Sequence, residues 1–350
     1  MSFSSKIISW YEENGRTLPW RGTDNPYHIW LSEIILQQTR IEQGMSYYQH
    51  FVETYPTVYD LANASEEQVL KSWQGLGYYS RARNLHTAAK QIVSQFGGSF
   101  PSTYKEILSL KGVGRYTAAA IASFAFRLPH PVIDGNVYRL IARIYDIATP
   151  IGTTAAYNEF EQVLLKLIDR QRPNLFNQAI MDFGSLYCKP VGCQCESCIF
   201  ASSCMAYQHG KVALLPVKGN GAKIKERYFY YFHIEWADSM TFMHQRTGND
   251  IWKGLYEFPL VEKEHPVPTE KLDSMALAFL QQFSTTPPVH LEQRASFTHQ
   301  LTHRTIHATF FYAKLDNVAW ESISKEKVFS YDELKKIPIS RLIDRYLSSL

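Results

Sequence analysis

The sequence predicts a multidomain protein in which an all-α domain is followed by a basic linker and a smaller α+β domain. In the N-terminal part, apolar residues recur every three or four positions, which is the spacing of helices that bury one face. In the C-terminal part, aromatic and β-branched residues dominate, as they do in strands. We therefore expect a helical domain at 1–210, a linker at 211–226 and an α+β domain at 227–350.

The predicted elements follow from these patterns. The helices expected in the first domain cover residues 29–41, 66–75, 81–96, 116–126, 137–147 and 157–168. Ser65, Ser102 and Thr154 are candidate start signals for three helical segments. The strands expected in the second domain cover residues 227–236, 239–245 and 304–315, with helices at 270–283 and 340–350.

Length and composition exclude several protein classes. The chain has 350 residues, of which 45% are hydrophobic and 20% charged, so it is neither disordered nor collagen-like. No apolar stretch is long enough to span a membrane, and the N-terminus lacks the pattern of an export signal. We therefore expect a cytoplasmic protein, and in a reducing compartment its five cysteines are more often metal ligands than disulfides.

Positive charge is concentrated in two segments, although the net charge is only +3. Residues 101–143 and 211–227 contain many more basic than acidic side chains. Such segments are typical of a surface that contacts phosphates, and they are equally typical of an ordinary solvated face. Charge alone leaves both interpretations open.

Four cysteines form a compact cluster at 188–204, just before the linker. They follow the spacing Cys-x6-Cys-x2-Cys-x5-Cys and are Cys188, Cys195, Cys198 and Cys204. Structural zinc sites usually contain two short cysteine pairs, whereas this segment has one pair between longer gaps, which favours a [4Fe–4S] cluster. Zinc is the alternative, and the extra Cys193 could replace a ligand or have no role.

A glycine turn lies between two helical patterns at about 104–126. Gly112 and Gly114 allow a tight turn at the start of the next helix, and Lys111 and Arg115 flank it. A Gly-x-Gly turn alone is often only a corner between helices. In this basic segment it predicts a helix-hairpin-helix that binds the DNA backbone without sequence preference.

Two acidic residues are candidates for acid and anion roles. Glu33 has apolar neighbours on its predicted helix, so we expect its pKa to be raised until it can donate a proton near neutral pH. An exposed Glu on the edge of an amphipathic helix is the alternative. Asp134 precedes a helical run, so we expect an N-cap whose pKa is depressed by the helix dipole. Two acids in opposed environments are typical of acid–base chemistry.

Together these features resemble the adenine DNA glycosylases of the MutY family, in the helix-hairpin-helix superfamily that includes endonuclease III. The motifs that carry the resemblance are Leu18–Arg21, Ser32-Glu33 through Thr39, Gly75–Tyr79, the glycine hairpin, Asp134–Asn136, Phe176–Ala179, the four cysteines, Gly254–Pro259 and Phe297–His299. They cover nearly the whole chain. The second domain resembles the Nudix fold of MutT-type nucleotide hydrolases.

The resemblance implies excision of adenine mispaired with 8-oxoguanine or guanine in duplex DNA by a monomeric enzyme, near the nucleoid if the source is bacterial. Glu33 would protonate the adenine and help to activate water, and Asp134 would stabilise an oxocarbenium-like sugar. The target base must leave the stack. The further residues that the resemblance implies are Tyr116 and Asn136 beside these acids, Arg21 and Gln178 at the flipped adenine, and Gln38 and Tyr78 near the opposing lesion.

Three other functions are considered. A bifunctional glycosylase and lyase would place a Schiff-base lysine where this chain has Tyr116, and a phenol cannot form an imine. A protein that only binds damaged DNA would need neither Glu33 nor Asp134. A Nudix hydrolase needs a Glu-rich helix after its glycine, whereas the segment just after Gly254 has only Glu257, Glu262 and Glu264, around prolines. The second domain is therefore expected to recognise the lesion.

Within that domain, Phe297, Thr298 and His299 are expected to form an exposed loop in which the hydroxyl and imidazole contact 8-oxoguanine. Phe297 could instead be a core anchor. His299, His303 and His307 do not predict a metal site, because their neighbours are typical of strand ends and a loop.

Overall fold

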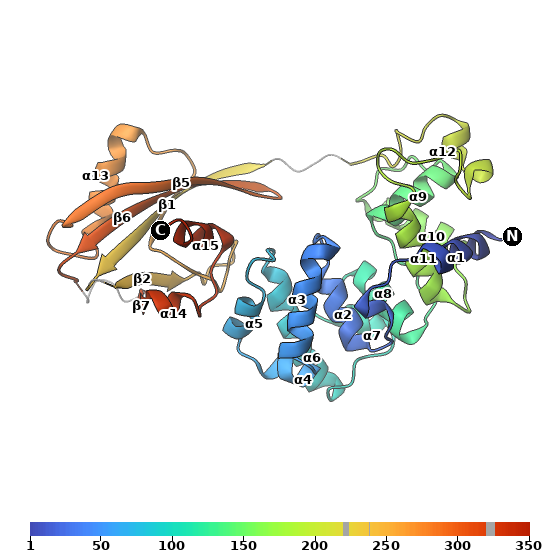
Figure 1. Ribbon diagram of the computed structural model, residues 1–350, viewed down its shortest axis with the longest axis horizontal. Coiled ribbons are helices and arrows are strands. Elements are labelled where there is room, and N and C mark those ends of the chain that lie inside the picture. Colours follow the sequence, from blue (N-terminus) through green and yellow to red (C-terminus); the bar gives the residue numbers. More distant parts are fainter. Residues whose placement is uncertain (220–223, 238, 320–325) are drawn as a thin grey trace. The chain divides into compact units, whose positions relative to one another are not determined.

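The computed structural model describes residues 1–219, 224–237, 239–319 and 326–350 (Figure 1). The chain divides into two compact units. The first, called here the helical unit, comprises Met1–Asn63 and Asn84–Asn220, and the second, called the sheet unit, comprises Ala64–Arg83 and Gly221–Leu350. The predicted order of an all-α domain followed by an α+β domain is confirmed.

The N-terminal part is helical throughout. Its elements are α1 (Phe3–Asn14), η1 (Pro19–Arg21), α2 (Pro26–Ile35), α3 (Ile41–Thr54), α4 (Val58–Asn63), α5 (Glu66–Ser72), α6 (Ser80–Phe96), α7 (Tyr104–Ser109), α8 (Arg115–Phe126), α9 (Gly135–Tyr145), α10 (Thr154–Leu167), α11 (Pro173–Leu186), η2 (Ala201–Ser203) and α12 (Met205–Gln208). Helices α1, α3, α4, α11 and α12 were not among the predicted elements. The predicted helix at 29–41 ends at Ile35, because Gln38 adopts a left-handed backbone conformation with φ of 55°.

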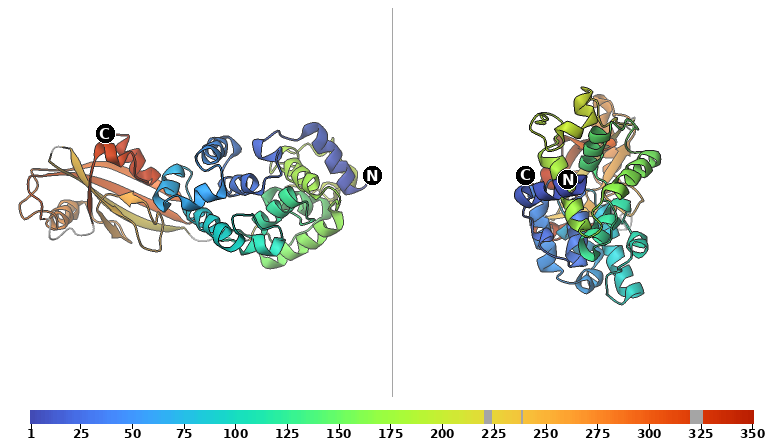
Figure 2. Two further views of the ribbon diagram at one scale, coloured as in Figure 1. Left: turned by 90° about the horizontal axis from the view of Figure 1, so that it is seen from below. Right: turned by 90° about the vertical axis from the view of Figure 1, so that its right-hand side faces the viewer.

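Apolar faces of α1, α9, α10 and α11 form a core of the helical unit. Phe160, Phe176 and Phe183 are completely buried in it. The same core includes Phe200 and the partly buried Cys198 from the segment after α11. This packing places the cysteine segment and α9 against α11. The ribbon views of Figure 2 show α1, at the end marked N, beside green helices of the same unit.

In its described residues, the sheet unit is built on a mixed sheet of seven strands. The strands are β1 (Lys225–Trp236), β2 (Met240–Gln245), β3 (Tyr256–Glu257), β4 (Leu260–Lys263), β5 (His290–Leu301), β6 (Arg304–Leu315) and β7 (Lys327–Ser330). The order is β3-β2-β1-β6-β5, with β4 on β1 and β7 on β2. Strands β1 and β6 are parallel from Lys225↔Arg304 to Trp236↔Leu315. Helices α13 (Thr269–Leu280), α14 (Tyr331–Leu334) and α15 (Arg341–Leu347) complete the unit.

Helices cover both faces of this sheet. On one face, Phe232 of β1 stacks on Phe279 of α13 with ring centroids 4.3 Å apart. On the other face, Phe310 of β6 stacks on Tyr346 of α15 at 4.2 Å. Because a strand alternates its side chains between faces and both faces are covered, β1 is buried at six consecutive positions, 229–234, rather than at every second one.

Residues 64–83 belong with the sheet unit, although sequence analysis included them in the helical domain. The Lys71 ammonium donates to the Ile337 carbonyl at 3.1 Å, and the Tyr79 hydroxyl donates to the Ile339 carbonyl at 3.2 Å. The Arg83 guanidinium donates to a carbonyl of the segment before β3. The linker at 211–226 stays a prediction, since residues 220–223 lie outside the described residues.

None of the helices in the described part of the chain is both long enough and apolar enough to cross a membrane.

Candidate active site and cysteine cluster

A cavity of about 870 Å³ opens in the helical unit and brings together most of the predicted site residues. Its walls come from η1, α2, the glycine hairpin, the start of α9 and the inner face of α11. The predicted residues that line it are Arg21, Glu33, Gln38, Gly112, Gly114, Tyr116, Asp134, Asn136 and Gln178. Sequence-distant segments therefore meet at one site, as the proposed acid–base chemistry requires.

Glu33 lies on α2 and is 9% exposed. The pKa of Glu33 is raised to about 7, mainly by burial and in part by the nearby Asp134, against the hydrogen bond from Tyr116 and the charge of Arg21, which lower it. The predicted direction of the pKa shift is confirmed. A carboxyl group with this pKa can hold a proton near neutral pH and release it.

Asp134 is the N-cap of α9, as predicted. Its Oδ1 accepts from the Val137 N–H at 2.7 Å, and its Oδ2 accepts from the Asn136 amide at 2.7 Å. The prediction of a depressed pKa is wrong: burial raises the pKa of Asp134, and the hydrogen bonds from Val137 and Asn136 offset only part of this effect. The helix terminus acts on a carboxylate that has lost most of its water, so the two acids share the same direction of shift.

Arg21 and Gln178 line the cavity beside Tyr11. The Tyr11 hydroxyl donates to Gln178 Oε1 at 2.8 Å. The Arg21 guanidinium lies over the Tyr11 ring and makes two hydrogen bonds to the Asp182 carboxylate, at 2.6 and 2.8 Å. Sequence analysis did not identify Asp182, although it follows Gln178 by one helical turn and hence lies on the same face of α11.

The glycine hairpin joins α7 to α8. Gly112 has φ of 77°, and a Cβ there would lie 2.6 Å from the Cβ of Asn84, so glycine is required. Gly114 is the N-cap of α8, which has neither a side-chain cap nor an acidic residue in its first turn. The N-terminus of α8 is thus suited to accept an external anion.

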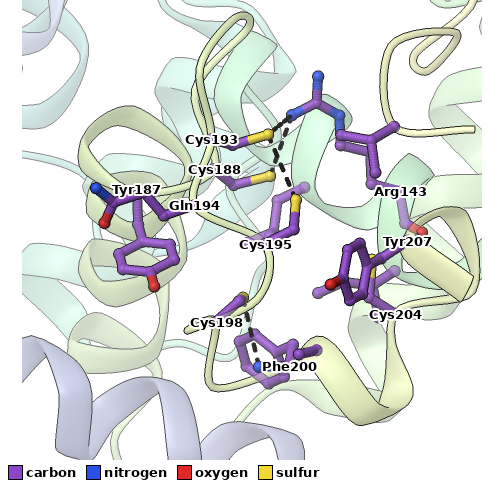
Figure 3. Close-up of a pocket in the computed structure, with 14 residues that line it drawn as sticks. Arg143, Tyr187, Cys188, Cys193, Gln194, Cys195, Cys198, Phe200, Cys204 and Tyr207 are labelled. Carbon is purple, nitrogen blue, oxygen red and sulfur yellow. Dashed lines mark hydrogen bonds between the residues drawn. The ribbon is translucent and has the colours of Figure 1, made fainter. Parts of the chain in front are cut away.

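The cysteine segment surrounds a small cavity of about 30 Å³ behind α9 (Figure 3). All five cysteines line it as free thiols. Cys193 and Cys195 have their sulfurs 3.5 Å apart. Among the described residues, no three His, Cys, Asp or Glu side chains are arranged to hold a metal ion. Sulfur donors gathered around one hollow are the ligand type that soft metal centres prefer.

Two arginines of the basic segment 101–143 hold the cysteine segment instead of forming a charged surface. Arg143 is 3% exposed and donates to the Lys189 carbonyl at 2.7 Å and to Cys188 Sγ at 3.4 Å. Arg139 donates to the Cys188 carbonyl at 2.8 Å. Sequence analysis considered a phosphate-contacting surface and a solvated face for this segment. It did not predict that two of its arginines would hold the cysteine segment from the inner side of α9.

Tyr78 lies in the sheet unit, where its backbone is left-handed with φ of 49° and its side chain is 48% exposed. The Tyr78 hydroxyl forms a short hydrogen bond with the Thr302 hydroxyl. Thr302 and His303 form the tip of the β5–β6 hairpin, and both are exposed. Tyr78 is thus held in a backbone conformation that few non-glycine residues adopt.

The expected loop at Phe297–His299 is wrong, because these residues lie inside β5 and pair with β6. Thr298 is exposed, whereas His299 is half-buried with its ring edge-on to Trp252 at 5.8 Å. The alternation of polar residues with Ala295, Phe297 and Leu301 along β5 is the strand signal that sequence analysis missed. The actual turn lies four residues later, at Thr302.

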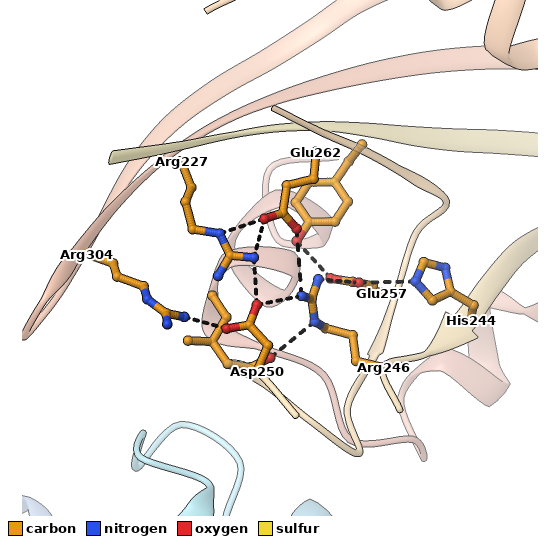
Figure 4. Close-up of polar contacts among 9 residues, drawn as sticks. Arg227, His244, Arg246, Asp250, Glu257, Glu262 and Arg304 are labelled. Carbon is orange, nitrogen blue, oxygen red and sulfur yellow. Dashed lines mark hydrogen bonds and ion pairs between the residues drawn. The ribbon is translucent and has the colours of Figure 1, made fainter. Parts of the chain in front are cut away.

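Two of the glutamates just after Gly254, Glu257 and Glu262, are held in ion pairs (Figure 4). Glu257 accepts from Arg246 at 2.7 Å and pairs with His244 at 3.1 Å, and Glu262 pairs with Arg227. Burial alone would lower the pKa of His244, but Glu257 and Glu326 raise it to about 9, so His244 is cationic. These carboxylates are neutralised by basic partners and are not arranged as magnesium ligands.

Comparisons with known proteins agree with both halves of the fold. A model of the HhH-GPD superfamily of base excision DNA repair proteins matches residues 31–167, and a model of the NUDIX domain matches residues 230–349. A thermostable thymine-DNA glycosylase has a TM-score of 0.56 and 28% identity, over 59% of this chain and 95% of that one. A trapped endonuclease III–DNA covalent intermediate shares the fold, with a TM-score of 0.52 and 22% identity, over 59% of this chain and 94% of that one.

Sequence relatives of this chain include adenine DNA glycosylases. The adenine DNA glycosylase of mouse is 39% identical over 227 residues, which are 61% of this chain and 44% of the mouse protein. The adenine DNA glycosylase of Buchnera aphidicola subsp. Baizongia pistaciae is 34% identical over 333 residues, which are 94% of this chain and 88% of that protein. A match of this length and identity shows that the chain belongs to the adenine DNA glycosylase family of base excision repair enzymes.

Proposed function

We propose that this protein excises adenine mispaired with 8-oxoguanine or guanine in duplex DNA, as a monofunctional glycosylase. The observation that carries the proposal is the convergence of Glu33, Tyr116 and Asp134 on one large cavity, with the Glu33 pKa near 7. This site lies beside a glycine hairpin whose helix terminus suits a DNA phosphate. An extruded base could enter the cavity, where the walls offer both a proton donor and a carboxylate.

In the proposed reaction Glu33 donates a proton to adenine, so that the base leaves as a neutral group. Asp134 then stabilises the positive charge that develops on the sugar. The hydrogen bonds from Val137 and Asn136 support its ionised form. Tyr116 hydrogen-bonds Glu33 and orients it. Arg21 and Gln178 contact the base through the guanidinium and the amide.

The lining of the cavity supports a monofunctional enzyme. A glycosylase that also acts as a lyase needs an amine to form an imine with the sugar. None of the described residues that line the cavity is a lysine, and Tyr116 occupies the position just after the hairpin. Hydrolysis by water is therefore the reaction that these side chains support.

The cysteine segment is proposed to hold a [4Fe–4S] cluster through Cys188, Cys195, Cys198 and Cys204. When bound, such a cluster would tie the segment into one rigid loop. Arg143 donates to Cys188 Sγ and would stabilise a thiolate there.

Lesion recognition is proposed for the sheet unit, with Tyr78 near the base opposite the adenine. Because Tyr78 hydrogen-bonds Thr302, we propose that the hairpin tip, rather than Thr298, contacts the lesion. Hydroxyl and imidazole groups of Thr302 and His303 could pair with the N7 hydrogen and O8 oxygen that distinguish 8-oxoguanine. Gln38, exposed at positive φ in the helical unit, is a second candidate contact.

The experiment is incubation with duplexes that carry adenine opposite 8-oxoguanine, guanine or thymine, followed by alkaline cleavage of the abasic strand. We expect cleavage for the first two and little for the third. Glu33→Gln should bind the mispair without excising adenine, because an amide cannot donate the proton. The matched control is Glu42→Gln, an exposed carboxyl on the rim of the same cavity, which should stay active. Near wild-type excision by Glu33→Gln would refute the proposed acid.

A further inference from the structure

Asp182 is a completely buried carboxylate, and in the described part of the chain its hydrogen-bond donors are Arg16 and Arg21. Its side chain is 0% exposed, and it lies on the inner face of α11 behind the wall of the cavity. It accepts hydrogen bonds from the backbone N–H of Arg16 at 3.0 Å, from Arg16 Nε at 3.0 Å and from both terminal nitrogens of Arg21. These donors keep the pKa of Asp182 low despite burial, which by itself raises it. The carboxylate is thus a fixed negative charge.

Arg21 is held in one orientation by this carboxylate. Its two terminal nitrogens bind the two oxygens of Asp182, a bidentate geometry, and Nη1 also donates to the Arg16 carbonyl at 3.1 Å. The Arg21 side chain is 12% exposed, so it has little water to bind in another orientation. Without Asp182, the guanidinium would need another acceptor within the cavity.

Glu33 is a carboxyl group that could serve as that acceptor. Charged and titratable groups face it from three elements: Arg21 on η1, Tyr116 on α8 and Asp134 at the start of α9. The Arg21 charge already lowers the pKa of Glu33 from its present position. An ion pair between Arg21 and Glu33 would favour the carboxylate and remove the proton that an acid must carry.

We propose that Asp182 is a positioning residue, which holds Arg21 against α11 and away from Glu33 so that Glu33 keeps its proton. The inference rests on the proposed function, in which Glu33 is the acid and Arg21 contacts the base. Asp182 itself touches neither the base nor the sugar. Its role is to separate a cation that binds substrate from the acid beside it.

The test is the pH dependence of single-turnover excision by Asp182→Asn in the full chain. Because Glu33 acts when protonated, excision is lost as the pH rises through the Glu33 pKa. In Asp182→Asn, Arg21 is released toward Glu33, and this loss should occur about one pH unit or more lower than in the wild type. A merely structural role would lower the rate at every pH without moving the high-pH limb of the pH–rate profile, which is where excision is lost. Asp182→Glu, which keeps the charge, should restore most of the wild-type profile.

Two further comparisons control for the general effect of losing a buried ion pair. Arg16→Gln removes the other partner of the same carboxylate and leaves Arg21 bound, so the limb should not move. In an Arg21→Gln background, adding Asp182→Asn should not move the limb either, since no cation remains to be released. An unchanged limb in Asp182→Asn, or an equal shift in the Arg21→Gln background, would overturn the proposal.

Glu33 protonation can also be followed without excision. In protein labelled with carbon-13 at glutamate side chains, the Glu33 carboxyl signal is assigned by its loss in Glu33→Gln. Its midpoint should be lower in Asp182→Asn than in the wild type. If the wild type excises no adenine but this midpoint moves, the proposed function fails, although Asp182 still controls Glu33 protonation through Arg21. If excision occurs and the midpoint is unchanged, the proposed function stands and the role of Asp182 is refuted. Should Asp182→Asn not fold, Arg21→Gln tests the premise: its Glu33 midpoint should be raised, because the charge that lowers this pKa is gone, and an unchanged midpoint would overturn the proposal.

Discussion

Arg139 Nη2 donates a hydrogen bond of 2.9 Å to Oδ1 of Asn136. Arg139 also donates through Nε to the carbonyl of Cys188, and the Asn136 amide donates to Asp134. Three consecutive hydrogen bonds therefore join the first cysteine of the cluster segment to the carboxylate in the cavity. The path is short because Asp134, Asn136 and Arg139 occupy the first turns of one helix, α9.

Substitution of Arg139 should weaken catalysis from outside the cavity. In Arg139→Gln, the Asn136 amide loses the partner that fixes its orientation, and with it the Asp134 carboxylate loses a positioned donor. We expect single-turnover excision to fall about tenfold or more, as when second-layer partners of a functional group are removed. DNA affinity should change less, and it can be measured on the same duplex by anisotropy. Arg127→Gln, an exposed arginine of the same basic segment, is the control; equal losses in both variants would contradict this path.

Glu33→Gln should lose activity and gain stability at high pH. The pKa of Glu33 is raised by burial to about 7 from 4.5, so the folded state binds this proton more tightly than the unfolded state does. Its stabilising contribution is complete below about pH 4.5 and is lost as the pH rises through about 7. Glutamine does not titrate, so the variant should exceed the wild type by no more than about 3 kcal/mol at about pH 8.5 and by little at about pH 5. Thermal unfolding at both pH values measures this, and a constant difference would contradict the assigned shift.

Substitutions of single cysteines should distinguish the four proposed cluster ligands from Cys193, the fifth thiol. Purified protein should contain iron and acid-labile sulfide in a yellow-brown solution. Cys198→Ser should lose iron, folding yield and DNA affinity together, because binding of a structural metal centre is coupled to folding. Cys193→Ser is the matched control in the same segment and should keep its iron. Stoichiometric zinc without iron in anaerobically prepared protein would contradict the cluster. Loss of iron in Cys193→Ser would indicate that Cys193 is a ligand in place of Cys195, whose sulfur lies 3.5 Å away.

The sequence predicts best where a local pattern determines the structure. Helix α9 and its N-cap at Asp134 follow from a short polar residue before an amphipathic run, and the aromatic run at 227–236 becomes β1. The direction of the Glu33 pKa followed from its apolar neighbours. The Asp134 pKa did not, because its burial depends on α8 and α11, which are distant in sequence. Asp182 and Thr302 were missed for the same reason: their partners Arg21 and Tyr78 are 161 and 224 residues away.

The β5–β6 hairpin tip gives the sharpest test of lesion recognition. Thr302 and Thr298 lie four residues apart, and both are exposed, but only Thr302 has its hydroxyl on Tyr78. Thr→Val removes the hydroxyl and keeps the shape, so each variant tests one hydrogen-bonding group. In Thr302→Val, Tyr78 loses its partner and the tip loses a donor and acceptor for 8-oxoguanine. Preference for adenine opposite 8-oxoguanine over adenine opposite guanine should then fall by the equivalent of about 1–3 kcal/mol.

Thr298→Val should keep that preference, because Thr298 lies in the paired part of β5 opposite His307. Excision of adenine opposite guanine should survive in both variants, since Glu33 and Asp134 lie in the helical unit. The measurement is the ratio of single-turnover rates and of affinities for the two duplexes. A loss of preference in Thr298→Val with none in Thr302→Val would return the contact to the strand, and unchanged ratios in both folded variants would place recognition outside this hairpin.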